Sequence, residues 1–202
     1  MIKRERIVQT FCDIVRIDSP SGEEENMASD IIQRLESLGF KTQKDSYGNV
    51  LASDGRKNPI LLSAHLDTVE PGRGIVPIVQ EDRIVSDGTT ILGGDCKAGV
   101  SAILEALESV VEDGGEYHPV EFAFTKEEEI GLVGARNLDF SLISAKEAIV
   151  FDGEGPVSQI TASSPTYIGL DIEITGRAAH AGVEPEKGLS AIKIAADIIN
   201  RL

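Results

Sequence analysis

Acidic residues or a histidine follow within a few positions of three apolar runs of strand length in this chain. The runs ILLSA, VEFAF and AIVF are followed by His65 and Asp67, by Glu127, Glu128 and Glu129, and by Asp152, respectively. Amphipathic helical patterns separate the runs, which favours an α/β sheet of largely parallel strands. Open sheets of this kind bind ligands beyond the carboxyl ends of their strands, so we expect these side chains to meet at one edge.

The apolar spacing predicts most of the secondary structure up to residue 155. Helices are expected at 3–17, from Ser21 to Leu38, at 97–112 and near 131–138. Ser21 and Glu24 resemble a capping box that opens the second helix. Strands are expected near 40–45, 49–53, 60–65, 75–79, 83–86, 120–125 and 147–151.

The pattern changes after residue 155. Alternating apolar residues predict a strand at 167–174, which is followed by the loop TGRAAHAGVEPEKG and a helix from about 187. We expect a catalytic domain over 1–160 and the beginning of a smaller lid or dimerisation domain over 161–202. So few elements could not bury their own apolar faces, and the last helix has no stop signal. The sequence therefore predicts an N-terminal fragment of a longer protein.

The charge balance excludes several classes of partner. Lys and Arg number 19 against 34 Asp and Glu, which gives a net charge of −15. Such a surface repels nucleic-acid phosphates and anionic lipid, and no apolar run of about 18 residues could span a membrane. The charged N-terminus and the lack of a disulfide framework predict a cytoplasmic protein, in which Cys12 is a core thiol. Cys96 could be a soft ligand, although a non-ligating role is favoured.

Each candidate ligand also has a structural explanation when it is taken alone. His65 could be a strand-end histidine that Asp67 orients by hydrogen bonding its second ring nitrogen. Asp95, between two glycines and a helix, could cap that helix or bridge two cations. The adjacent glutamates could form a solvated acidic turn, or one could bind metal while its neighbour holds a water. His118 precedes the strand at 120–125, roughly 20 Å from its carboxyl end, and is expected to lie outside any such site.

Five motifs, in their order and spacing, resemble the dinuclear zinc exopeptidases. The motifs are HLDT, GGDCKAG, TKEEEIG, FDGEG and GRAAHAG. That family includes peptidase T, carboxypeptidase G and the acetylornithine and succinyl-diaminopimelate deacylases; TKEEEIG and SPSGEEE are most similar to peptidase T-like tripeptidases. The resemblance implies a three-layer α/β catalytic domain with a mostly parallel sheet, followed by a smaller α+β lid. One departure is Cys96, at a position where the family often has another acid.

The resemblance implies a site for two zinc ions, with Mn²⁺ or Co²⁺ as alternatives. His65 and Asp152 would hold one ion and Glu129 the other, with Asp95 as the bridge. A catalytic zinc usually has three protein ligands and a water, so the second ion is one ligand short. We expect that ligand to lie beyond Leu202, so that this chain by itself is inactive or impaired.

The resemblance also implies a function and further roles. The parent protein would hydrolyse amide bonds of small peptides with a metal-activated water, for which Glu128 is the general base. Asp67 would orient the histidine ligand, and His180 would reach the active site of a partner subunit in a homodimer formed through the lid. An N-acyl amino acid deacylase of the same family is the alternative. A non-catalytic binding or structural module is an alternative of another class.

Overall fold

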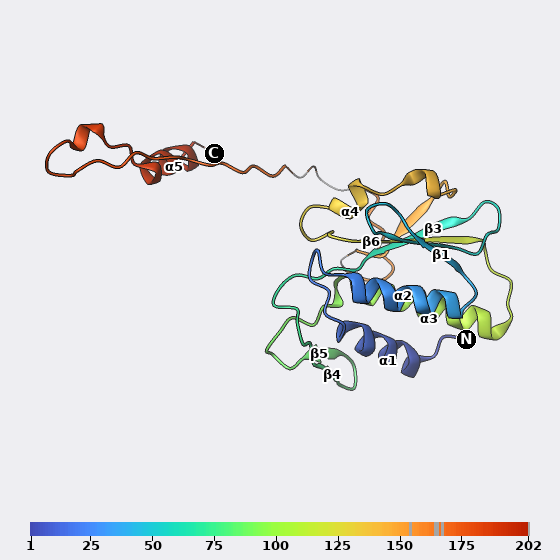
Figure 1. Cartoon of the computed structure of the whole chain (residues 1–202). Helices are drawn as coiled ribbons and strands as arrows, with labels where there is room; N and C mark the ends of the chain where they lie inside the picture. The colour runs from blue at the N-terminus through green and yellow to red at the C-terminus, as the bar shows by residue number, and fades with distance from the viewer. Residues whose placement is uncertain (154, 164–165, 167, 202) are drawn as a thin grey trace. The chain divides into compact units, whose positions relative to one another are not determined.

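The computed structural model describes residues 1–153, 155–163, 166 and 168–201, and it divides the chain into two compact units, Met1–Gln159 and Ile160–Leu202 (Figure 1). The first unit is built on a five-stranded sheet with the order β1-β2-β6-β3-β7. Its strands are β1 (Lys41–Lys44), β2 (Val50–Ser53), β3 (Ile60–His65), β6 (Val120–Thr125) and β7 (Ala148–Val150).

The strands that precede the candidate ligands are parallel to one another. β3 pairs in parallel with both β6 and β7, whereas β1 and β2 form an antiparallel extension at one edge. In this register His65 lies opposite Thr125, and Ser63 lies opposite Val150. The carboxyl ends of β3, β6 and β7 therefore share one edge, and the predicted α/β class is confirmed.

Helices on both faces of the sheet produce three layers (Figure 1). One face is covered by α2 (Glu25–Ser37) and α3 (Gly94–Asp113), with α1 (Arg4–Val15) packed against α3. The main core lies on this side and includes Ile31, Leu35, Val100, Leu104, Phe122 and Phe124. The other face carries α4 (Val133–Arg136) and the short helix η1 (Phe140–Leu142), above a smaller cluster of Leu51, Leu61 and Ala123.

A separate hairpin packs near the first helix. It consists of β4 (Pro77–Val79) and β5 (Ile84–Ser86), which pair antiparallel. Phe11 and Val15 of α1 form a small cluster with Ile75, against which Ile84 packs. Cys12 is buried, as predicted for a core thiol. Among the described residues, no helix has both the length and the apolar content needed to cross a membrane.

The predicted start of the second helix is wrong. α2 begins at Glu25, and the capping box does not form, because the Ser21 hydroxyl donates instead to Asp67 Oδ2 at 2.7 Å. The helix starts too late for Ser21 to cap it, and the preceding loop reaches the carboxyl edge of the sheet. α3 spans Gly94–Asp113, but Asp95 and Cys96 have non-helical backbone angles, so its regular helical stretch begins at Lys97, as predicted.

The described part of the second unit contains one α-helix, α5 (Ala191–Ile199), whose N-cap Ser190 accepts a hydrogen bond from the Lys193 amide. A bridge joins Arg177 to Leu189, and the short helix η2 (Pro185–Lys187) lies between them. The strand predicted at 167–174 begins at a residue outside those described, and residues 168–174 form no strand, so that prediction is wrong. An extended segment needs a neighbouring strand to pair its backbone groups, and none is formed in the described part of this unit. The assignment of the two units to catalytic and lid domains stays a prediction.

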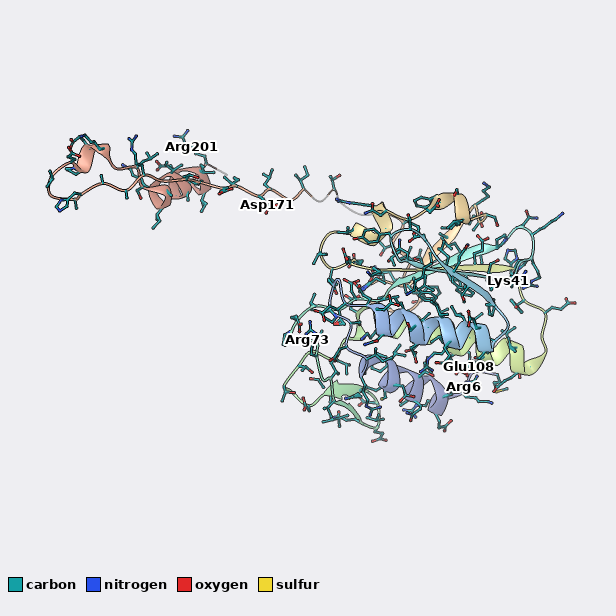
Figure 2. All side chains as sticks on the ribbon, viewed as in Figure 1. Arg6, Lys41, Arg73, Glu108, Asp171 and Arg201 are labelled. Carbon is teal, nitrogen blue, oxygen red and sulfur yellow. The ribbon has the colours of Figure 1, made fainter. Side chains whose placement is uncertain are left out.

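A buried ion pair joins α1 to α3. Arg6 donates to both carboxylate oxygens of Glu105, at 2.6 and 2.9 Å, and the Glu105 side chain is only 1% exposed. Arg6 Nε also lies 3.0 Å from Glu108 Oε2 of α3. Figure 2 labels both residues, where α1 and α3 pack together. The hydrogen bonds from Arg6 outweigh burial and lower the pKa of Glu105 from 4.5 to about 2.

This pair predicts how unfolding depends on pH. Because the pKa of Glu105 is lowered on folding, its contribution is complete above its unfolded pKa and is lost as pH falls from about 4.5 towards 2. We expect Glu105→Gln to lower the free energy of unfolding by about 2 kcal/mol at pH 7 and by much less at pH 2.5. Urea denaturation at both pH values measures this, with the more exposed Glu108→Gln as control. Equal losses in the two variants, or a loss that persists at pH 2.5, would contradict the prediction.

Candidate metal centre

His65 ends β3 with its imidazole buried at the carboxyl edge of the sheet. Its Nδ1 lies 2.9 Å from the carbonyl oxygen of Asp67 and 3.3 Å from Asp67 Oδ1. The sequence predicted that the Asp67 side chain would bond this nitrogen, but the backbone oxygen of Asp67 is the nearer partner. With the Nδ1 proton donated to Asp67, the Nε2 atom is available as a metal ligand.

Other predicted site residues, the candidate ligands Asp95 and Asp152 and the candidate general base Glu128, gather around the Nε2 atom of His65. Asp95 Oδ1 lies 3.0 Å from it, Asp152 Oδ1 3.6 Å and Glu128 Oε2 4.0 Å. Two groups of residues could each hold a metal ion, because the donor atoms within each group all lie within 4.8 Å of one another. One group is His65, Asp95, Cys96 and Asp152, and the other is His65, Glu128 and Glu129. The structure thus brings together residues that are up to 87 positions apart in the sequence. Their assignment as metal ligands stays a prediction.

The charges of this cluster favour a cation. Burial opposes protonation of His65, but hydrogen bonds to Asp152, Asp67 and Asp95 raise its pKa to about 11. Burial and the neighbouring carboxylates raise the pKa of Glu128. A bound divalent ion would relieve this excess of negative charge. One imidazole nitrogen and several carboxylate oxygens are a donor set that suits Zn²⁺, Mn²⁺ or Co²⁺, so the residues present fit such an ion.

Asp67 links the histidine to the two glutamates. It is fully buried, and its Oδ1 accepts from the Glu128 amide at 2.9 Å. Its Oδ2 accepts from the Glu129 amide at 3.1 Å and from the Ser21 hydroxyl at 2.7 Å. Burial alone would raise the pKa of Asp67, but the adjacent His65 imidazole and the hydrogen bonds from Ser21 and the two amides lower it to about 2. Ser21 is a site residue that the capping-box interpretation missed.

A buried lysine fastens the start of α3, which carries Asp95. Lys97 is fully buried, and its Nζ donates to the carbonyl oxygen of Ile17 at 2.9 Å. Burial lowers the pKa of Lys97 to about 8. The bond ties the helix to the segment that leads into Ser21. Sequence reasoning missed Lys97, since its position in a glycine-rich motif gives no sign of its burial.

Asp95 and Asp152 come together because α3 passes close to the end of β7. The Cys96 thiol donates to the carbonyl oxygen of Phe151, the residue before Asp152. Gly99 makes this contact possible, since a Cβ atom there would lie 2.8 Å from Phe151 Cβ and 3.1 Å from Cys96 Sγ. Burial raises the pKa of Cys96 to about 12, which keeps the thiol protonated as a donor.

The close passage at Gly99 predicts a defect in metal binding. Gly99→Ala should push α3 away from Phe151 and separate Asp95 from Asp152, lowering Mn²⁺ affinity by about 10–100-fold, as loss of supporting contacts does at other metal sites. Isothermal titration calorimetry of the purified chain measures this. The control is Gly115→Ala, whose added Cβ meets nothing within 4 Å. Unchanged affinity in the Gly99 variant would contradict this explanation.

The two remaining histidines are His118 and His180. His118 is exposed in the loop before β6, at the amino end of that strand, so the prediction that it lies outside the site is confirmed. His180 belongs to the second unit, where its Nδ1 accepts from the Gly182 amide at 3.2 Å. Its role stays a prediction. Within the described residues of Met1–Gln159, His65 supplies the only imidazole at the cluster.

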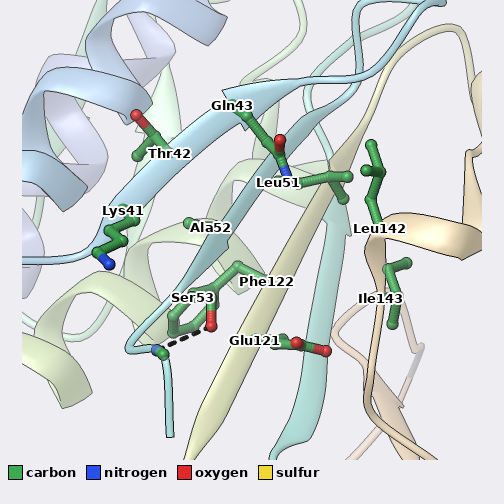
Figure 3. Close-up of a pocket in the computed structure, with 11 residues that line it drawn as sticks. Lys41, Thr42, Gln43, Leu51, Ala52, Ser53, Glu121, Phe122, Leu142 and Ile143 are labelled. Atoms are coloured by element: carbon green, nitrogen blue, oxygen red, sulfur yellow. Dashed lines mark hydrogen bonds between the residues drawn. The ribbon is translucent and has the colours of Figure 1, made fainter.

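A cavity of about 280 Å³ lies at the opposite end of the sheet (Figure 3). It is lined by residues of β1, β2 and β6, including Ser53 and Glu121, and by Leu142 and Ile143. Figure 3 shows Leu142 and Ile143 beside Leu51 on one face of the sheet. Because Glu121 stands near the amino end of β6, this cavity is separate from the metal-ligand cluster.

Comparison with known proteins identifies the family. The sequence profile of Peptidase family M20/M25/M40 matches residues 61–200, which include His65, Asp95, Glu129 and Asp152. The chain belongs to Peptidase family M20/M25/M40. Over its whole length it is 37% identical to the uncharacterised protein YqjE of Bacillus subtilis. It is 26% identical, over 98% of its length, to peptidase T of Listeria monocytogenes.

Solved structures of this family have the same fold. The chain matches the aminopeptidase PepT of Bacillus cereus over its full length, with a TM-score of 0.77 and 36% identity. It matches a tripeptidase of Staphylococcus aureus over its full length, with a TM-score of 0.80 and 30% identity. The chain covers 57% of each of these two structures and 57–60% of the two relatives above.

Proposed function

We propose that this chain carries the metal site of a peptidase that cleaves amide bonds of small peptides, as a peptidase T-like aminopeptidase or tripeptidase. The observation that carries the proposal is the cluster in which carboxylates from three other segments surround the His65 Nε2 atom. Membership of an M20 family implies a divalent metal. The printed names of similar proteins, peptidase T, aminopeptidase PepT and tripeptidase, support peptides as substrates.

Two zinc ions would occupy the complete site, with Mn²⁺ or Co²⁺ as alternatives. His65 and Asp152 would bind one ion, Glu129 the other, and Asp95 both. The short distances from His65 Nε2 to Asp95 and Asp152, 3.0 and 3.6 Å, support the first group. The second ion would draw a further ligand from elsewhere in the parent protein.

The remaining site residues would handle protons and positions. A bound metal pair lowers the pKa of a water towards 7 and polarises the scissile carbonyl. Glu128 would accept the proton of that water and pass it to the leaving amine, and its Oε2 atom, 4.0 Å from His65 Nε2, places it beside the candidate metal ligands. Asp67 would hold His65 and Glu128 in position through the contacts described above. His180 would steady the tetrahedral intermediate at the site of a partner subunit in a homodimer.

The cellular location belongs to the same proposal. Cys12 and Cys96 are both buried and unpaired. Free thiols of this kind are typical of a reducing compartment. We therefore place the protein in the cytoplasm, where its substrates would be small peptides.

The substrate class can be tested on the full-length gene product. We expect chelation to abolish hydrolysis of unblocked tripeptides and Zn²⁺ or Mn²⁺ to restore it, with far slower release of amino acids from N-acetyl derivatives. Preference for the N-acetyl compounds would instead support an amide deacylase. Metal binding with no hydrolysis of either class would support a non-catalytic module.

Glu128 allows a sharper test of the mechanism. In the full-length protein, Glu128→Gln should lower kcat by about 10²–10⁴-fold, the usual contribution of general base catalysis, and leave the metal content unchanged. Elemental analysis and peptide hydrolysis measure the two quantities. Glu116→Gln, in the exposed loop before β6, is the control and should retain both. Retained turnover in the Glu128 variant would rule out this assignment.

A further inference from the structure

Four consecutive backbone amides at the end of β6 donate to side chains rather than to the backbone. The turn 126–129 contains Glu128 and Glu129, and its amides are held by three acceptor residues. The bonds are Lys126 N to Asn49 Oδ1 at 3.1 Å, Glu127 N to Glu24 Oε1 at 3.1 Å, Glu128 N to Asp67 Oδ1 at 2.9 Å and Glu129 N to Asp67 Oδ2 at 3.1 Å.

The three acceptors come from separate parts of the fold and are fully buried. Asn49 precedes β2, Glu24 precedes α2 and Asp67 follows β3. Removing the acceptor of a hydrogen bond leaves its donor unsatisfied, which costs about 1–3 kcal/mol where water has little access. The turn 126–129 is therefore held at every residue by groups that other elements position.

The backbone of this turn needs such support. Glu127 has a φ of 51°, in the left-handed region that residues other than glycine seldom adopt. A non-glycine residue persists there only when its surroundings hold it. Glu127 immediately precedes Glu128, so a change at Glu127 would redirect both site carboxylates.

Glu24 is the acceptor with no other evident purpose. Its Oε1 accepts from Gly22 N at 2.8 Å as well as from Glu127 N, and it does not cap α2. Its Oε2 makes no hydrogen bond and lies 3.4 Å from Lys126 Nζ. Burying a carboxylate in this way is costly. A purely structural acceptor could be supplied by a neutral group.

We propose that Glu24 is a positioning residue, which holds the Glu127 amide and thereby directs Glu128 and Glu129 towards the metal ions. The geometry of the turn carries this inference, and only its effect on catalysis rests on the proposed function. Lys126 serves as the counter-ion that allows Glu24 to stay buried. Glu24 contacts neither substrate nor metal, so its effect is transmitted through the backbone.

The test compares variants that differ only in the acceptor. Two double variants are compared, and both carry Lys126→Met, which removes the counter-ion. One adds Glu24→Gln and the other adds Glu24→Met. Gln keeps an acceptor for the Glu127 amide, Met has similar size without one, and neither leaves a buried charge. Amide hydrogen exchange of the whole metal-free chain is followed by NMR, and Mn²⁺ affinity is measured by calorimetry.

We expect the Glu127 amide to exchange slowly in the double variant with Glu24→Gln. In the double variant with Glu24→Met, the exchange rate of this amide should rise at least tenfold and the Mn²⁺ affinity should fall about 10–100-fold. Equal exchange and equal affinity in the two double variants would overturn the proposal. Since exchange is measured without metal, a full-length protein that hydrolyses no peptide would overturn the proposed function and leave this inference standing.

Glu121 offers a matched control at the other end of β6. It is also buried, and it accepts from Ser144 N, Ser144 Oγ and Ala145 N at 2.8–2.9 Å. Glu121→Met should destabilise the chain without changing exchange at Glu127 or Mn²⁺ affinity. An equal loss of affinity in this variant would show that general destabilisation explains the effect, and the proposal would fail.

Discussion

The carboxylate of Asp67 joins the parts of the site that the sheet alone only brings near one another. It follows the strand that ends in His65, and it receives the amides of Glu128 and Glu129 from the neighbouring strand. Ser21 completes its hydrogen bonds from a third segment. Because Asp67 is fully buried, each of these bonds replaces one to water, and the carboxylate stays ionised with a pKa of about 2.

Charge explains why such an arrangement suits a cation. Several carboxylates meet around one imidazole, and burial raises the pKa values of Glu128 and Glu129. The donors that offset this repulsion are the His65 imidazole and, at Asp67, the Ser21 hydroxyl and the amides of Glu128 and Glu129. Other buried carboxylates of the chain have direct partners: Glu105 has Arg6, and Glu121 has three donors. The cluster around His65 is thus the place where positive charge is most needed.

Parallel pairing was predictable because each strand is a short apolar run bounded by turns, and because helices separate the runs. The positions of His65, Glu128, Glu129 and Asp152 at strand ends follow from the same pattern. Ser21, Glu24 and Lys97 were not predictable in this way. Their contacts span 46 to 103 residues, and each residue has a common local explanation, such as a helix cap or a solvated charge.

The sequence by itself determined the α/β class, the strands that end in the candidate ligands, and the motif set that indicates the family, since these depend on local periodicity and order. Only the tertiary structure decided which side chains hold the candidate ligands in place. Asp67 accepts a hydrogen bond from His65 at its backbone oxygen, and its carboxylate accepts the amides of Glu128 and Glu129. Gly99 has no side chain, so α3 can pack closely against Phe151. Such contacts depend on the packing of distant segments to within an ångström, and no local pattern in the sequence encodes that distance.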